Sequence, residues 1–158
     1  MEPIHFPEFL RAYNWLYKEG NAIYHRLAGH FGLSDTAFWI LYSLREADHP
    51  LNQAELSAIL CTSKQTVNSA LKSLEGEGYI RLESAAGDRR SKEIHLTEKG
   101  LLLARESVDQ VLALEERATQ RLSEEERLAI LALGRRHLEA LRQETEALLA
   151  VSQNPQEE

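Results

Sequence analysis

Polar side chains between positions 63 and 72 are the first candidates for chemistry in this sequence. The apolar residues nearby recur at helical spacing, so they define an inner face that leaves the polar ones outward. The outward set is Ser63, Lys64, Gln65, Thr66, Asn68, Ser69 and Lys72. Amide and ammonium groups on one helix face can read base edges in the major groove of DNA or bind its phosphates.

Each of these side chains suits a different partner on a duplex. The amides of Gln65 and Asn68 suit adenine, and Thr66 suits a thymine methyl group. Lys64 suits guanine or phosphate, and Lys72 suits phosphate. Two plainer interpretations stay open: the face could be merely solvated, and Gln65 stands three residues after Thr62, which is the spacing of a capping box.

A second basic cluster follows at Asp88-Arg89-Arg90 and Lys92. Residues 79–83 and 92–96 alternate apolar and polar side chains, which predicts two paired strands with a polar loop over 84–91. Arginines on such a loop suit a narrow minor groove, where negative potential is concentrated. Arg89 and Arg90 are equal candidates for this insertion.

The elements that position these residues are predicted by capping signals. Asn52 and Glu55 form a capping box before a helix at about 53–60, and a second helix is expected at about 63–76. Two capped helices joined by a tight turn indicate a helix-turn-helix, and the hairpin after it forms a wing. Longer helices are expected over 6–31, from Ser34 to about 48, over 98–121, and from Ser123 to about 150. The fold class is therefore mainly α with a small β-hairpin wing.

The terminal helices carry more apolar surface than one chain can easily hide. In the last helix, Leu131, Leu138 and Thr145 form one seven-residue series, and Gly134, Leu141 and Leu148 form another. We therefore expect a homodimer. The predicted organisation is a single domain over 1–158, with a winged helix-turn-helix at 34–97 and dimerisation helices at 1–31 and 98–150.

The charge distribution locates the candidate interface better than the total charge does. The 158-residue chain has a formal net charge of −7, which by itself disfavours nucleic acid. Residues 1–61 have a net charge of −3, residues 62–97 of +1, and residues 98–158 of −5. Because phosphate would repel most of the surface, this pattern favours docking through the middle segment.

Several classes of protein are disfavoured. We find no apolar run long enough for a membrane span and no signal peptide, and the single Cys61 excludes an internal disulfide and suits the cytoplasm. A lone cysteine is usually a small buried hydrophobe, although oxidant sensing by Cys61 stays possible. No phosphate-binding glycine loop, nucleophile elbow or ligand-spaced histidine cluster is found. We therefore expect no enzyme, no metal and no cofactor.

The combined motifs resemble those of the multiple-antibiotic-resistance regulator (MarR) family. The resemblance is carried by the helix-turn-helix, the Asp88-x-Arg90 wing and the Leu96-Thr97-x-x-Gly100 segment after it, and it spans essentially the whole chain. It implies a DNA-binding repressor, a two-fold dimer on a pseudo-palindromic operator, and release by oxidation or by a small ligand, for which aromatic and phenolic compounds are candidates. It also implies that Asp88 pairs with Arg90 and aims an arginine at the minor groove.

The resemblance further implies an effector pocket between the first two helices and the helix-turn-helix, often one for aromatic acids. Candidate lining residues are Tyr13, His30, Trp39 and Tyr42, although core packing also explains aromatic side chains there. Two alternatives stay open: a winged helix used for protein–protein contact, and a DNA binder without an effector.

Overall fold

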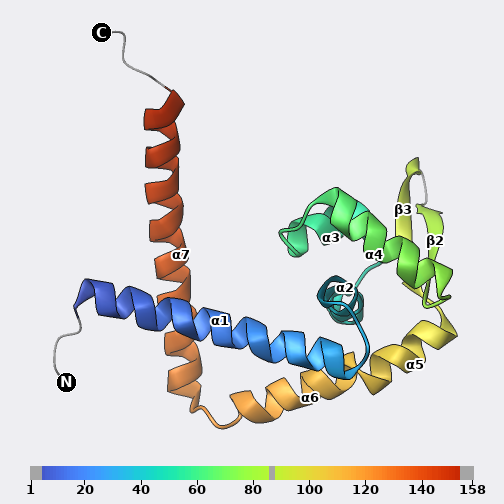
Figure 1. The fold of residues 1–158 in the computed structure, drawn as a ribbon, viewed down its shortest axis with the longest axis horizontal. Coiled ribbons are helices and arrows are strands. Elements are labelled where there is room, and N and C mark those ends of the chain that lie inside the picture. Colours follow the sequence, from blue (N-terminus) through green and yellow to red (C-terminus); the bar gives the residue numbers. More distant parts are fainter. Residues whose placement is uncertain (1–4, 86–87, 154–158) are drawn as a thin grey trace. The chain divides into compact units, whose positions relative to one another are not determined.

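The structure is a computed structural model that describes residues 5–85 and 88–153. The side chains of residues 85–91 and 151–153 lie outside this description. The order of the helices and strands along the chain is shown in Figure 1. The chain forms two compact units, Met1–Leu112 and Ala113–Glu158, which are described separately. In the described part, no helix combines the length and apolar character that a membrane crossing needs.

The first two helices begin and end close to the predicted positions. α1 spans Phe6–His30, and α2 spans Asp35–Glu46. The side chain of Ser34 accepts a hydrogen bond from the Ala37 amide and so caps α2, as predicted. Helix α2 is the centre of the core, because Phe38, Ile40 and Leu41 are fully buried.

The helix-turn-helix consists of α3, Gln53–Ile59, and α4, Lys64–Gly76. The predicted capping box is confirmed: the Asn52 side chain accepts from the Glu55 amide, and the Glu55 carboxylate accepts from the Asn52 amide. The turn between the helices contains Cys61 with a positive φ of 48°, which is uncommon for a residue other than glycine. Cys61 is exposed, so the expectation of a buried cysteine is wrong.

The cap of α4 differs from the predicted one. The N-cap residue is Ser63 rather than Thr62, and its hydroxyl accepts from the Thr66 amide at 3.1 Å. The Thr62 hydroxyl instead donates to the Leu60 carbonyl. The helix therefore starts one residue later than the capping-box pattern suggested. The residue three positions after the cap is Thr66, so Gln65 is not the partner in a capping box.

The hairpin is longer than predicted and belongs to a three-stranded antiparallel sheet. Strands β2, Ile80–Ala85, and β3, Asp88–Leu96, extend into the region that was expected to be loop. A two-residue strand β1, Leu51–Asn52, gives the order β1-β3-β2 and was not predicted. Ile80 and Ile94 are buried, so the alternating pattern correctly identified the inner face.

The helix predicted over 98–121 is broken at Ser107. The chain forms α5, Glu98–Glu106, and α6, Val108–Thr119, and Ser107 between them has φ −125° and ψ −80°. The buried Ser107 hydroxyl donates to the Leu103 carbonyl at 2.6 Å. Arg45 of α2 then holds the start of α6 through two hydrogen bonds to Asp109, at 2.8 and 2.7 Å. This pair lowers the pKa of Asp109 and raises that of Arg45.

The second unit contains the end of α6 and the long helix α7, Glu124–Gln153. The last helix begins after Ser123, as predicted. A capping box stabilises this start, because the Ser123 hydroxyl accepts a hydrogen bond from the Glu126 amide and the Glu126 carboxylate accepts one from the Ser123 amide. Large apolar side chains of α7 are exposed, among them Leu131, Leu138 and Leu141.

Candidate nucleic-acid interface

Helix α4 has one buried face and one polar face. Val67, Leu71 and Leu74 are 0%, 3% and 2% exposed, because they pack into the core. On the opposite side, Asn68 is half-buried, and the other candidate side chains are exposed: Ser63, Lys64, Gln65, Thr66, Ser69 and Lys72. The helix therefore presents all seven predicted contact residues away from its core contacts.

The polar groups of this face differ in what they can still offer a partner. The hydroxyls of Ser63 and Thr66 lie 2.9 Å apart at the cap, and Ser69 donates to the Gln65 carbonyl. Within the described residues, the side-chain amides of Gln65 and Asn68 make no hydrogen bond. The same holds for the ammonium groups of Lys64 and Lys72. These four side chains keep their full capacity to bind an external group.

Helices α3 and α4 are joined by a hydrogen bond that sequence analysis missed. The Gln53 side-chain amide donates to the Lys64 carbonyl at 2.8 Å, which fixes the start of α4 against the start of α3. Gln53 also borders a cavity of about 290 Å³ between α4 and the hairpin, together with Asn68, Lys72 and Lys92. The structure thus brings the hairpin residue Lys92 close to the candidate residues of α4.

The hairpin is held on the helix-turn-helix by the Leu96-Thr97-x-x-Gly100 segment. Thr97 caps α5, and its hydroxyl lies within hydrogen-bond distance of the Gly78 carbonyl at 2.7 Å. Gly100 is buried against the Tyr79 carbonyl, where any Cβ atom would overlap the backbone. Lys99 lies 4.4 Å from the centre of the Tyr79 ring and donates to the Glu77 carbonyl. This motif therefore fixes where the wing emerges.

Charged side chains on the outer face of the sheet pair with one another. The Arg81 guanidinium donates to Glu83 at 2.6 Å and lowers the pKa of that carboxyl. His95 lies 3.4 Å from a Glu93 oxygen and 3.7 Å from a Glu83 oxygen. The side chains of Asp88, Arg89 and Arg90 lie outside the described residues, so their pairing and groove contacts stay predictions.

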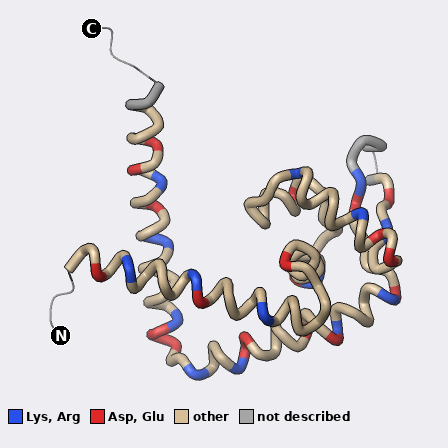
Figure 2. The backbone as a smooth tube through the Cα atoms, in the orientation of Figure 1, with Lys and Arg blue, Asp and Glu red and all other residues tan. Residues whose placement is uncertain are grey.

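Charge is sparse along the helix-turn-helix itself. Figure 2 shows α3 and α4 as mostly uncharged, much like α1, whereas charged residues are denser along α5, α6 and α7. The candidate contacts on α4 are accordingly two lysines among neutral hydrogen-bonding side chains. Such a face suits base reading more than strong non-specific phosphate binding.

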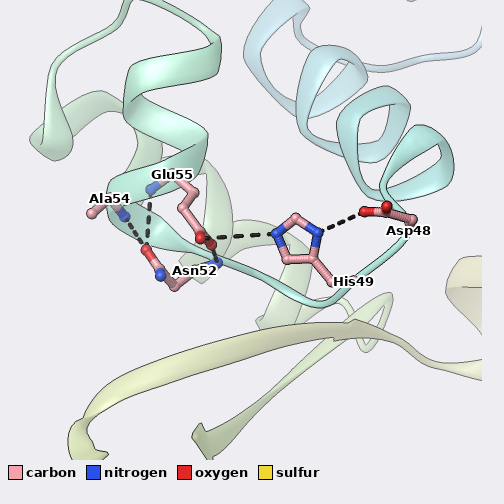
Figure 3. A network of polar contacts seen from close by, with 5 residues as sticks. All are labelled: Asp48, His49, Asn52, Ala54 and Glu55. Atoms are coloured by element: carbon pink, nitrogen blue, oxygen red, sulfur yellow. Dashed lines mark hydrogen bonds and ion pairs between the residues drawn. The ribbon is translucent and has the colours of Figure 1, made fainter.

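A network of polar contacts surrounds the start of α3 (Figure 3). His49 Nδ1 lies 2.7 Å from an Asp48 oxygen, and its Nε2 lies 3.9 Å from a Glu55 oxygen. Asn52 accepts from the amides of Ala54 and Glu55. The hydrogen bond with Asp48 raises the pKa of His49, and the nearby negative charges add to this effect.

We expect the His49 imidazole to titrate above 6.5, its ordinary pKa. A group whose pKa is higher in the folded than in the unfolded protein stabilises the fold at a pH below its unfolded-state pKa. This contribution is lost as the pH rises through its folded-state pKa. Substituting Asp48→Asn should move the midpoint back toward 6.5. An NMR titration of the imidazole protons measures both midpoints, and an unchanged midpoint in the variant would contradict the assigned cause.

A larger cavity, of about 440 Å³, lies between α2 and the end of α3. Trp39 and Tyr42, two of the four aromatic pocket candidates, line it. Tyr13 and His30 are not among its lining residues; Tyr13 stacks on Phe9, and His30 packs against Phe31. Asp35 and Glu46 also line the cavity but were not predicted. The signal for them in the sequence was their helical spacing from Trp39 and Tyr42. In the described part of the chain, no His, Cys, Asp and Glu group is placed to hold a metal ion.

Comparison with known proteins places this architecture in a family. The sequence model of the MarR family matches residues 31–91. The HTH-type transcriptional repressor NicR of Pseudomonas putida is 30% identical over 125 residues, which cover 78% of each chain. The HTH-type transcriptional regulator PecS of Dickeya dadantii is 32% identical over 105 residues, but the match covers only 63% of its length.

A solved structure agrees with these sequence matches over most of the chain. The crystal structure of a MarR transcriptional regulator from Methanosarcina mazei superposes with a TM-score of 0.63 at 26% identity. The superposition covers 85% of this chain and 96% of the other. This chain therefore belongs to the MarR family of winged-helix transcriptional regulators.

Proposed function

We propose that this MarR-family regulator binds a pseudo-palindromic operator as a homodimer and represses transcription until a small ligand releases it. The observation that carries the DNA-binding step is the polar face of α4. Its side-chain amides and ammonium groups make no hydrogen bond within the part of the chain that the structure describes, and they lie opposite the buried Val67, Leu71 and Leu74. A recognition helix enters the major groove with such a face, while the wing arginines Arg89 and Arg90 contact the minor groove.

Apolar surface on the terminal helices supports the dimer. Phe6, Leu16 and Tyr17 of α1 are more than half exposed, as are Leu131, Leu138 and Leu148 of α7. Large exposed apolar patches on soluble proteins usually mark interaction surfaces. A second copy of the chain would cover them, and a two-fold axis would present two α4 helices to one face of the duplex.

Repression is supported by a relative, and control by an effector is supported by a cavity. The relative NicR is named a transcriptional repressor, which favours the same sign of regulation here. The cavity of about 440 Å³ beside α2 and α3 supports ligand control, because an occupant would contact the helix that precedes α4. Such a ligand acts only if it binds the DNA-free arrangement more tightly.

Selection of bound sequences from a random DNA pool tests the proposal. We expect an enriched inverted repeat whose half-sites are one helical turn apart, at about 34–36 Å. Failure to enrich any sequence would favour the competing function, a winged helix that docks on another protein.

Two substitutions on α4 should separate base reading from phosphate binding. Asn68→Ala should change the preferred base at one position, since a good bidentate contact contributes about 1–3 kcal/mol of discrimination. Lys72→Ala should weaken all sequences similarly and reduce the salt slope of log K by about 0.9. Fluorescence anisotropy over several salt concentrations measures both effects.

The control is Lys18→Ala, which removes an exposed charge from α1. It should leave both sequence preference and salt slope unchanged. If Asn68→Ala weakens every sequence equally, its role in base reading is wrong.

A further inference from the structure

The cavity between α2 and the end of α3 has an ordered wall. Asp35, Trp39, Tyr42 and Glu46 lie at positions i, i+4, i+7 and i+11 of α2, so they share one face of the helix. The Trp39 and Tyr42 rings meet edge to face with centroids 5.2 Å apart. The wall therefore places a pair of aromatic rings between two carboxylates.

Two of the hydroxyl groups that line the cavity, those of Ser43 and Thr62, add acceptors rather than donors. Ser43 uses its proton in a hydrogen bond to the Trp39 carbonyl at 2.8 Å, and Thr62 donates to the Leu60 carbonyl at 3.0 Å. What these two hydroxyls still offer a ligand is their lone pairs. Of the described residues that line the cavity, none is a lysine, arginine or histidine.

The two carboxylates are not equally available. Both oxygens of Asp35 lie close to His25 Nδ1, at 2.9 and 3.0 Å. The Glu46 carboxylate makes no hydrogen bond or ion pair with any other residue that the structure describes, and it is exposed. Glu46 is therefore the carboxylate that is left to bind a charged ligand. The faces of tryptophan and tyrosine also attract cations.

We propose that this cavity binds a protonated aromatic amine, with its ring against Trp39 and Tyr42 and its ammonium group at Glu46. The inference rests on the proposed function in that the bound amine would be the effector. An aromatic acid is disfavoured, because its carboxylate would meet two like charges and no described cation in the cavity wall. The charge of the cavity thus separates this regulator from an acid-responsive one.

Two probes with the same ring and opposite charge test the assignment: tryptamine and indole-3-propionate. Isothermal titration of the full chain should show tryptamine binding at least about tenfold more tightly, a difference of ~1.4 kcal/mol. Glu46→Gln should weaken tryptamine binding by about tenfold, since losing a hydrogen bond to a charged group typically lowers affinity by about that factor or more. Glu46→Lys should reverse the preference and favour indole-3-propionate.

The matched control is Glu106→Gln, which removes an exposed carboxylate of α5 outside the cavity and should leave tryptamine binding unchanged. Circular dichroism confirms that each variant is folded. The proposal is overturned if native protein binds indole-3-propionate as tightly as tryptamine, if it binds neither at millimolar concentration, or if Glu46→Gln binds tryptamine normally.

The DNA selection described above distinguishes this failure from failure of the proposed function. An enriched palindrome without tryptamine binding would remove only the ligand assignment. Tryptamine binding that depends on Glu46, with no enriched DNA sequence, would leave the cavity assignment in place and remove the operator-binding function.

Discussion

Replacing Gly100 with alanine is expected to destabilise the first unit by about 3 kcal/mol, at the upper end of the usual cost of overpacking. The added Cβ would overlap the Tyr79 carbonyl oxygen and also crowd Leu96. Backbone cannot swing aside as a flexible side chain can, so β2 and α5 must separate. The same separation moves the wing, and we therefore expect operator affinity to fall as well.

Urea denaturation followed by circular dichroism measures the change in the free energy of unfolding. The control is Gly29→Ala in α1, where an added Cβ meets nothing within 4 Å. Because alanine is the better helix former, this control should gain about 0.5–1 kcal/mol. If Gly100→Ala is as stable as the native chain, the close approach to Tyr79 does not constrain the hairpin.

Replacing Leu138 with glutamate is expected to separate the proposed dimer and to weaken binding to its palindromic operator by about 100-fold or more. Leu138 is 53% exposed on α7, so the substitution leaves the helix of one chain intact but puts a charge into the surface that a second chain would cover. Two linked α4 helices gain roughly 10²- to 10⁴-fold in avidity over one, which is lost when the chains separate.

Analytical ultracentrifugation and anisotropy on full and half operators test this prediction. The variant should sediment as a monomer and bind the full and half operators with similar affinity. Gln143→Glu adds the same charge to another exposed position of α7 and should remain dimeric. A dimeric Leu138→Glu protein with normal affinity would place the interface elsewhere.

Local signals explain which parts of the fold were predictable. Capping boxes act over four residues, so the starts of α3 and α7 follow directly from Asn52-x-x-Glu55 and Ser123-x-x-Glu126. At α4 two adjacent hydroxyl residues compete for the cap, and backbone geometry selected Ser63 over Thr62. The wing was recognisable because its alternation and the glycines before it are also local.

Features set by distant contacts escaped sequence analysis. The helical spacing of apolar residues continues through Ser107, so the sequence does not predict the break between α5 and α6. The buried Ser107 hydroxyl donates to the Leu103 carbonyl, which no sequence pattern distinguishes from other carbonyls. Strand β1 is too short to have a pattern, and it forms because Leu51 pairs with Ile94. Asp35 and Glu46 lie at the two ends of α2, where charged side chains are usually solvated. The cavity beside them could not be predicted, because it depends on where α3 packs.

The two-residue strand β1 has a consequence for aggregation. A hairpin has two open edges, and each offers unpaired backbone groups to strands of other molecules. Here β1 covers β3 at Glu93 and Ile94, while the remaining edge strand, β2, carries the charged Arg81 and Glu83. Charges on an edge strand oppose the addition of another strand. We therefore expect edge-to-edge association to be opposed at Glu93 and Ile94, where β1 covers β3, and along β2.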